Sequence, residues 1–224
     1  MNYDWEVFTR ENRTPAGTFD CYELLNRHGA DPMLAEMDNW CGPDGVLYDI
    51  GANVGIYAVA LTVDRPRRRV LAFEPNLTVV EQLCANVRVN DLQEQIRIHN
   101  AGIGSKSGRR PFYRSTYPEL SSFDRESATR WGASVRAVVD VEMRDLDSVV
   151  CQSPSPDVVK VDVEGAAPDV IEGATRTLQY AEPVLFVEVH EDGIEEGTGL
   201  RKRLHDHGYN IAERETYWRC EPGH

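Results

Sequence analysis

The acidic and glycine residues between Asp49 and Gly55 are of types that could bind a ligand. Asp49 lies in the apolar run 46–50, and Gly51 and Gly55 follow it with three residues between them. Because glycine has no Cβ, both positions let the backbone approach a ligand closely. The next residues, 56–61, are mostly apolar and suit a helix. We therefore predict a strand, a tight turn and a helix start that cradle a ligand at the carboxyl end of a parallel strand.

The charge of this turn indicates which ligand it takes. A dinucleotide fingerprint needs G-x-G-x-x-G, whereas this chain has G-x-x-x-G preceded by Asp49, which disfavours an NAD-dependent oxidoreductase. A carboxylate suits a ligand carrying an ammonium or a sulfonium better than one carrying phosphates. S-adenosylmethionine carries both cations, so we predict it as the cofactor. The plainer interpretation is a turn without a ligand.

Glu74 ends the next predicted strand, 70–73, and lies 23 residues beyond Gly51. An acid at this position can accept hydrogen bonds from both ribose hydroxyls of an adenosyl group. The alternative is an exposed glutamate at a strand end.

Lys160, Asp162 and Glu164 alternate with valines along the segment 158–163. Alternation places the three charges on one face of a strand. A central parallel strand is normally apolar on both faces, so these charges carry a desolvation cost unless they are paired or lie at an opening.

Glu188 and His190 share a face at the end of the segment 184–189 in the same way. We expect the two charged strands to be neighbours, with Lys160 paired to Glu188 and with Asp162, Glu164 and His190 nearer the opening. A structural ion-pair network that only shapes the rim is the alternative.

Helical and extended segments alternate along the chain, which predicts an α/β fold with a doubly wound, mostly parallel sheet and an antiparallel last hairpin. The predicted strands are 46–50, 70–73, 96–100, 158–163 and 184–189, the helices are 54–63, 78–90, 168–178 and 200–207, and the hairpin is 210–214 with 217–220. We expect one domain over 46–224, with 1–45 as a helical or irregular cap over the site.

Residues 105–136 break this alternation. We expect a loop with a short strand near Phe112, paired with 138–141. The hydroxyls and aromatic rings of this segment suit a lid over a polar acceptor, and a plain surface loop is an equal alternative. The side chains concerned are Tyr113, Tyr117, Ser121, Ser122 and Trp131.

Composition narrows the class of protein. The chain has 224 residues and a net charge of −13, with 3 lysines against 21 arginines. This negative field argues against a nucleic-acid partner, and an acid-rich, lysine-poor chain also fits a salt-loving host. No apolar run approaches the ~20 residues of a membrane span, and no signal peptide is visible. Five scattered cysteines favour the reducing cytoplasm over a disulfide framework.

Four segments occur in an order that resembles the FkbM family of S-adenosylmethionine-dependent methyltransferases. They are Asp49-Ile-Gly-Ala-Asn-Val-Gly55, Ala72-Phe-Glu-Pro-Asn76, Asn86-x-x-x-Asn90 and Lys160-Val-Asp-Val-Glu-Gly165. The resemblance covers roughly residues 46–190 and implies the seven-stranded, Rossmann-like fold of class I methyltransferases. It implies O-methylation of a hydroxyl on a sugar, glycan or other small metabolite.

The resemblance also implies roles for single residues. Cofactor contacts fall at Asp49, Gly51, Asn53, Gly55, Glu74, Asn76 and Asp162, and the catalytic or substrate face falls at Lys160, Asp162 and Glu164. One departure is that Ala166-Ala167 occupies the region where the family commonly has a second glutamate, whose role Asp169 could take over.

Methyl transfer to a hydroxyl needs a proton acceptor, and Asp162, Glu164 and His190 are the candidates. We predict no metal site, although a divalent cation shared by these three residues is a lesser alternative. A cofactor-binding scaffold without catalysis is the alternative from another class of protein. The sequence leaves open the acceptor, the identity of the base and the oligomeric state.

Overall fold

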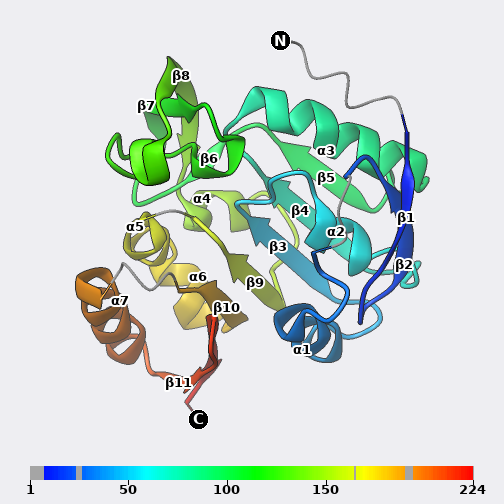
Figure 1. Ribbon diagram of the computed structural model, residues 1–224. Helices are drawn as coiled ribbons and strands as arrows, with labels where there is room; N and C mark the ends of the chain where they lie inside the picture. The colour runs from blue at the N-terminus through cyan, green and yellow to red at the C-terminus, as the bar shows by residue number, and fades with distance from the viewer. Residues whose placement is uncertain (1–7, 24–26, 164, 190–193, 224) are drawn as a thin grey trace.

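A seven-stranded sheet forms the centre of the protein (Figure 1). The computed structural model describes residues 8–23, 27–163, 165–189 and 194–223. Five strands are parallel, and the last two form an antiparallel hairpin at one edge, in the order β11-β12-β10-β9-β3-β4-β5. Their bounds are Val46–Ile50 (β3), Arg69–Phe73 (β4), Ile96–His99 (β5), Val158–Val161 (β9), Val184–Glu188 (β10), Tyr209–Glu213 (β11) and Tyr217–Pro222 (β12). This confirms the predicted mostly parallel, doubly wound sheet with its final hairpin.

The order of the strands places a crevice between β3 and β9. The chain runs from β3 outward to β4 and β5, then returns on the other side of β3 as β9. Ligands of open α/β sheets bind where the strand order reverses in this way, outside the carboxyl ends of the strands.

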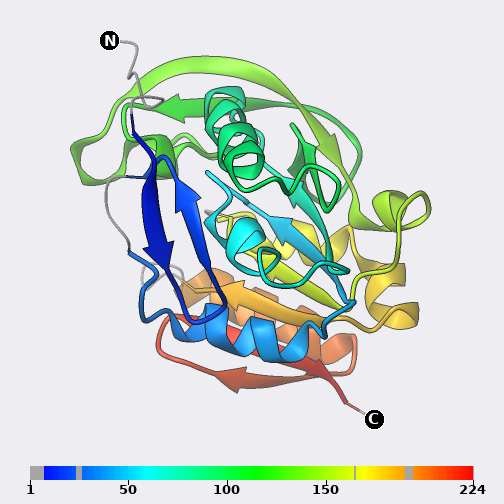
Figure 2. The same cartoon turned by 90° about the vertical axis from the view of Figure 1, so that its right-hand side faces the viewer.

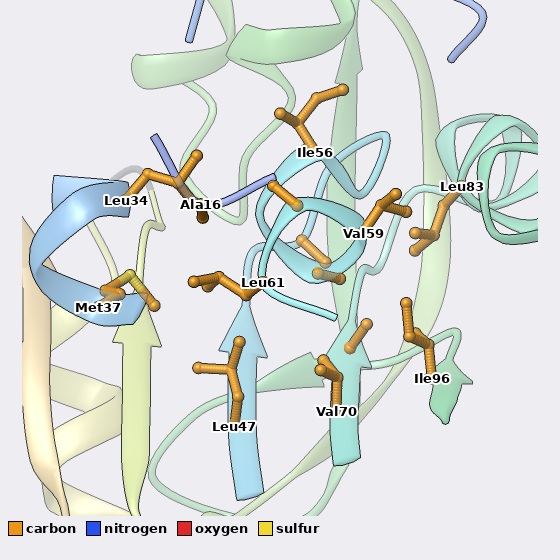
Figure 3. Packing of buried hydrophobic residues seen from close by; sticks show 14 of the residues in the cluster. Ala16, Leu34, Met37, Leu47, Ile56, Val59, Leu61, Val70, Leu83 and Ile96 are labelled. Atoms are coloured by element: carbon orange, nitrogen blue, oxygen red, sulfur yellow. The ribbon is translucent and has the colours of Figure 1, made fainter. Parts of the chain in front are cut away.

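Alternate residues of the central strands belong to two separate hydrophobic cores, one on each face of the sheet. On one face, Leu47 and Val70 pack under α1 (Pro32–Trp40), α2 (Ile56–Ala60) and α3 (Leu77–Val89), as Figure 3 shows for Leu61 and Leu83. On the other face, Tyr48 packs with Leu71 under four later helices. These are Leu146–Val150 (α4), Ala167–Glu172 (α5), Thr175–Tyr180 (α6) and Ile194–Asp206 (α7).

The first 45 residues contain a β-hairpin that the sequence did not indicate, followed by α1. The hairpin strands are β1 (Arg10–Arg13) and β2 (Thr18–Cys21), and Figure 2 shows them, in dark blue, outside α2 and α3. Asn90, the C-cap residue of α3, accepts a hydrogen bond from the Asp20 amide (2.9 Å) and donates to the Asp20 carbonyl. Asn86 accepts from the Tyr22 amide at 2.9 Å. The Asn-x-x-x-Asn spacing therefore fixes the hairpin to α3.

The single helix predicted over 168–178 is two helices, α5 and α6, separated at Gly173. A Cβ at Gly173 would lie 2.1 Å from the Gly104 carbonyl oxygen, so the backbones meet there. Asp147 then starts α6 by accepting hydrogen bonds from the amides of Arg176 (3.0 Å) and Thr177 (2.7 Å). Local periodicity does not reveal this contact because it joins residues far apart in the sequence.

A small three-stranded sheet stands apart from the main one, at the upper left of Figure 1. It consists of β6 (Gly102–Ile103), β7 (Gly108–Ser115) and β8 (Val135–Arg144), with 3-10 helices η2 (Pro118–Leu120) and η3 (Ser127–Gly132) between the last two strands. Phe112 pairs with Val139, which confirms the predicted pairing, although both strands are longer than expected. We call residues 108–144 the arm.

Candidate functional site

A cleft opens at the carboxyl ends of β3, β4 and β9, between the main sheet and the arm. The sheet side contributes Gly51, Asn53, Glu74, Pro75, Val79, Asp162, Val163 and Ala166, and the arm contributes Phe112, Pro118, Ser121, Ser122 and Phe123. Four of the predicted site residues therefore line one cleft, which they reach from the ends of three different strands, as the strand-end argument requires: Gly51, Asn53, Glu74 and Asp162.

Gly51 joins the ends of two strands at the floor of this cleft. Its φ is +78°, and a Cβ there would lie 1.8 Å from the Asp162 carbonyl oxygen. The amides of Gly51 and Ala52 both donate to the Phe73 carbonyl at 3.0 Å, and the Asp162 amide donates to Ile50 at 3.0 Å. A side chain at Gly51 would force β3 and β9 apart, so only glycine permits this turn.

Glu74 is a carboxylate that the chain buries at the wall of the cleft. It is 8% exposed, and its two oxygens accept hydrogen bonds from the backbone amides of Asn53 (3.0 Å) and Asn76 (2.8 Å). Burial raises the pKa of Glu74 to about 7, against the opposing effect of the two amides. Each oxygen has a second lone pair, so the group can accept two further hydrogen bonds from a ligand.

Lys160 lies directly behind the cleft wall, between two carboxyl groups. Its Nζ is 2.9 Å from Asp162 Oδ2 and 3.3 Å from Asp49 Oδ1, and it donates to the Gly51 carbonyl at 3.4 Å. Burial lowers the pKa of Lys160, but Asp162 and Asp49 outweigh that effect and raise it. Among the described residues, these are its ion pairs, so the predicted pair with Glu188 is wrong; Glu188 acts on Lys160 only as a nearby charge.

The reason for this correction is the position of β9 in the sheet. The strand pairs with β10 on one side and with β3 on the other, and Lys160 is the direct partner of Asp49 across the β3 pairing. Asp49 is fully buried, which raises its pKa, so the lysine beside it offsets part of the desolvation cost of the carboxyl group. Strand β9 ends at Val161, before Asp162, whose side chain is 31% exposed.

The remaining predicted residues divide into several groups. Gly55 is the N-cap residue of α2, and its φ of +86° lies in the left-handed region that favours glycine; a Cβ there would also meet the end of the Leu83 side chain at 2.1 Å. Asn76 is 4% exposed, and its Oδ1 accepts no hydrogen bond from the described residues. Glu164 and His190 lie outside the described residues.

The described residues hold no group of three or more His, Cys, Asp or Glu side chains placed to bind a metal ion. They also include no helix long and apolar enough to cross a membrane.

Two residues near the cleft, Tyr57 and Asn100, were missed by the sequence reasoning. Tyr57 lies with its ring over Lys160, and Asn100 donates to the carbonyls of Glu74 (2.9 Å) and Pro75 (3.0 Å), which shapes the turn after β4. Asn100 directly follows a strand end in the sequence, a signal that could have identified it. No such signal exists for Tyr57, which lies within a helix.

The residues present fit S-adenosylmethionine as a cofactor. Glu74 offers acceptor positions for ribose hydroxyls, and Gly51 leaves room for close approach of a ligand to the backbone. Two carboxyl groups, Asp49 and Asp162, surround the single cation of Lys160, which favours a positively charged ligand.

Comparison with known proteins gives the family of this chain. Residues 49–211 match the model of the methyltransferase FkbM domain. The hexuronic acid methyltransferase AglP of Haloferax volcanii is 32% identical, over 76% of this chain and 66% of its own length. Methyltransferase sdnD of Sordaria araneosa is 28% identical, over 90% of this chain and 82% of its own length. The 2-O-methyltransferase NoeI of Sinorhizobium fredii is 28% identical, over 69% of this chain and 67% of its own length.

Solved structures agree at the level of the fold. The crystal structure of the FkbM methyltransferase from Methylobacillus flagellatus superposes with a TM-score of 0.56 at 20% identity, over 80% of this chain and 44% of that one. A putative rRNA methylase from Clostridium thermocellum superposes with a TM-score of 0.55 at 8% identity, over 85% of this chain and 93% of that one. Because the family match spans most of the chain and includes the turn at Gly51, Glu74 and Asp162, the chain belongs to the FkbM methyltransferase domain family and is a methyltransferase.

Proposed function

We propose that this protein transfers the methyl group of S-adenosylmethionine to a hydroxyl oxygen of a sugar, a glycan or another small metabolite. The observation that carries the proposal is Glu74, a buried carboxylate at the cleft wall with acceptor capacity left over. Support for a sugar comes from the relatives, because one is named for hexuronic acid and another for 2-O-methylation.

The residues of the cleft divide the work between binding and exclusion of water. Glu74 accepts hydrogen bonds from the ribose hydroxyls, and Gly51 keeps the turn open for the ligand. Phe112 and Phe123 belong to the arm and cover the side of the cleft that faces the main sheet, which keeps water from the reacting centre. When bound, S-adenosylmethionine supplies a methyl carbon attached to a positively charged sulfur.

The acceptor hydroxyl attacks in line with the departing sulfur, so alignment is the main requirement. Transfer of the methyl group to a hydroxyl oxygen would release the hydroxyl proton, and a base of this chain would accept it. Asp162 faces the cleft, with one oxygen held by Lys160. Glu164 or His190 is the base that we propose. The variants Glu164→Gln and His190→Ala are expected to slow turnover ~10²–10⁴-fold while cofactor affinity stays nearly unchanged.

Labelled S-adenosylmethionine tests the proposal. The protein is incubated with the methyl-labelled cofactor and a panel of uronic acids, neutral glycosides and glycan extracts. An O-methyl ether survives mild alkali, whereas a methyl ester does not, so the expected product keeps its label after base treatment. NMR then assigns the methylated position. Label found in nitrogen-linked methyl groups, in RNA or only in alkali-labile esters would contradict the proposal.

A further inference from the structure

Lys160 presents an electrostatic problem for a site that binds a sulfonium. Its ammonium group does not line the cleft, but it contacts Asp162, which does. The lysine side chain is a flexible four-carbon stem that carries a point charge. If this stem moved toward the cleft, its positive charge would repel the positively charged sulfur of the cofactor.

Four groups surround the ammonium and hold it back. Asp162, Asp49 and the Gly51 carbonyl provide oxygens at 2.9, 3.3 and 3.4 Å from Nζ. The fourth is the aromatic ring of Tyr57, whose centroid lies 4.8 Å from Nζ. A cation at this distance from a ring is attracted by the negative face of the π system.

The ring of Tyr57 is itself fixed from the N-terminal side of the chain. Its hydroxyl donates to Asp31 Oδ2 at 2.6 Å, and His28 lies edge-on to the ring at 5.5 Å between centroids. His28 Nδ1 also lies 2.8 Å from the same Asp31 oxygen. The other Asp31 oxygen accepts from two amides at the start of α1, so the first turn of a nine-residue helix anchors the ring.

We propose that Tyr57 is a positioning residue that restrains the Lys160 ammonium against Asp49 and Asp162, out of the space that a sulfonium occupies. Asp31 keeps the ring in place. The proposal rests on the proposed function, because it assumes that the ligand is S-adenosylmethionine. It explains why an aromatic side chain of α2 faces a buried lysine of β9.

The charge of the ligand provides the test. S-adenosylhomocysteine, the product, lacks the methyl group and the positive charge on sulfur but is otherwise the same molecule. Calorimetry measures both affinities for wild type, for Tyr57→Leu, which removes the ring, and for Tyr57→Phe, which keeps it. The control is Tyr48→Phe, which removes another partly buried tyrosine hydroxyl bond, that to the Pro154 carbonyl at 2.8 Å, away from Lys160.

We expect Tyr57→Leu to weaken S-adenosylmethionine on the order of tenfold, with S-adenosylhomocysteine changed less than about threefold. Tyr48→Phe should keep the wild-type ratio of the two affinities. Tyr57→Phe keeps the ring but loses its hydrogen bond to Asp31, so it should show the selective loss in smaller measure. If Tyr57→Leu does not fold, Asp31→Ala releases the ring without removing it, and the same selective loss is expected in smaller measure.

This experiment distinguishes failure of the role proposed for Tyr57 from failure of the proposed function. Equal weakening of both ligands, or no weakening of either, in the folded ring variant would overturn the proposal and leave Tyr57 a packing residue. Failure of the wild-type protein to bind either ligand would instead overturn the proposed function.

Discussion

The role that we propose for Glu74 makes cofactor binding depend on pH in a window that can be calculated. With its pKa at about 7, the free carboxyl group is about nine-tenths ionised at pH 8 and about one-tenth ionised at pH 6. Ribose hydroxyls donate their hydrogen bonds to the ionised form, so only that fraction is ready to bind. Affinity for S-adenosylhomocysteine should therefore fall about tenfold, or about 1.4 kcal/mol, from pH 8 to pH 6.

Calorimetry at pH 6, 7 and 8 measures this change, and buffers of different ionisation enthalpy count the protons. About half a proton should be released on binding at pH 7. Glu74→Gln should bind more weakly by ~1–3 kcal/mol and show a flat profile. Glu94→Gln, at an exposed glutamate, should keep the wild-type slope. An affinity of the wild-type protein that does not change between pH 6 and 8 would refute the reasoning.

The same carboxyl group affects folding with a definite sign. Its pKa is about 7 in the folded protein against an ordinary value of 4.5, so the folded state binds more protons between these values. The free energy of unfolding of the ligand-free protein should therefore decrease as pH rises from 4.5 to 7, with a contribution from Glu74 of about 3 kcal/mol. Denaturation curves that show the same pH dependence for wild type and Glu74→Gln would contradict this assignment.

Three further outcomes are expected. Lys160→Met should lower the free energy of unfolding by roughly 3–5 kcal/mol, because it leaves Asp49 buried without its cation; adding Asp49→Asn should restore part of the loss in urea denaturation, and no recovery would count against the pair. Gly51→Ala should abolish cofactor binding and lower the melting temperature, whereas Gly42→Ala, whose Cβ meets no described atom within 4 Å, should do neither. Asn90→Ala should cost about 1–2 kcal/mol by releasing the β2 backbone, and proteolysis should then cut the hairpin faster than in wild type.

The sequence predicted those parts of the candidate site that lie directly after the end of a strand. Gly51, Glu74 and Asp162 follow runs whose length and composition indicate parallel strands, and parallel strands end at the same edge of a sheet. Alternation also identified Lys160 as a charge that needs a partner, because a side chain on a central strand is buried away from water.

The partner of Lys160 could not be predicted in the same way. Register decides whether Asp49 or Glu188 lies beside it, and the residue pattern of β3 and β10 permits both. Tyr57 and Asp31 were missed for a related reason. Their contact joins the start of α1 to α2, and the spacing within each helix says nothing about the angle between them.

The separation of the arm from the main sheet has a consequence for how such a domain can change its acceptor. The arm supplies two of the three strands of the small sheet and has its own hydrophobic cluster, centred on Phe112, Val141 and Met143, distinct from the two cores beneath the main sheet. It nevertheless supplies one side of the cleft. Exchange of residues 108–144 between related enzymes would therefore replace one wall of the candidate site while the strand ends that we propose as the cofactor site keep their packing. The architecture permits new acceptors to be acquired by recombination of a single segment.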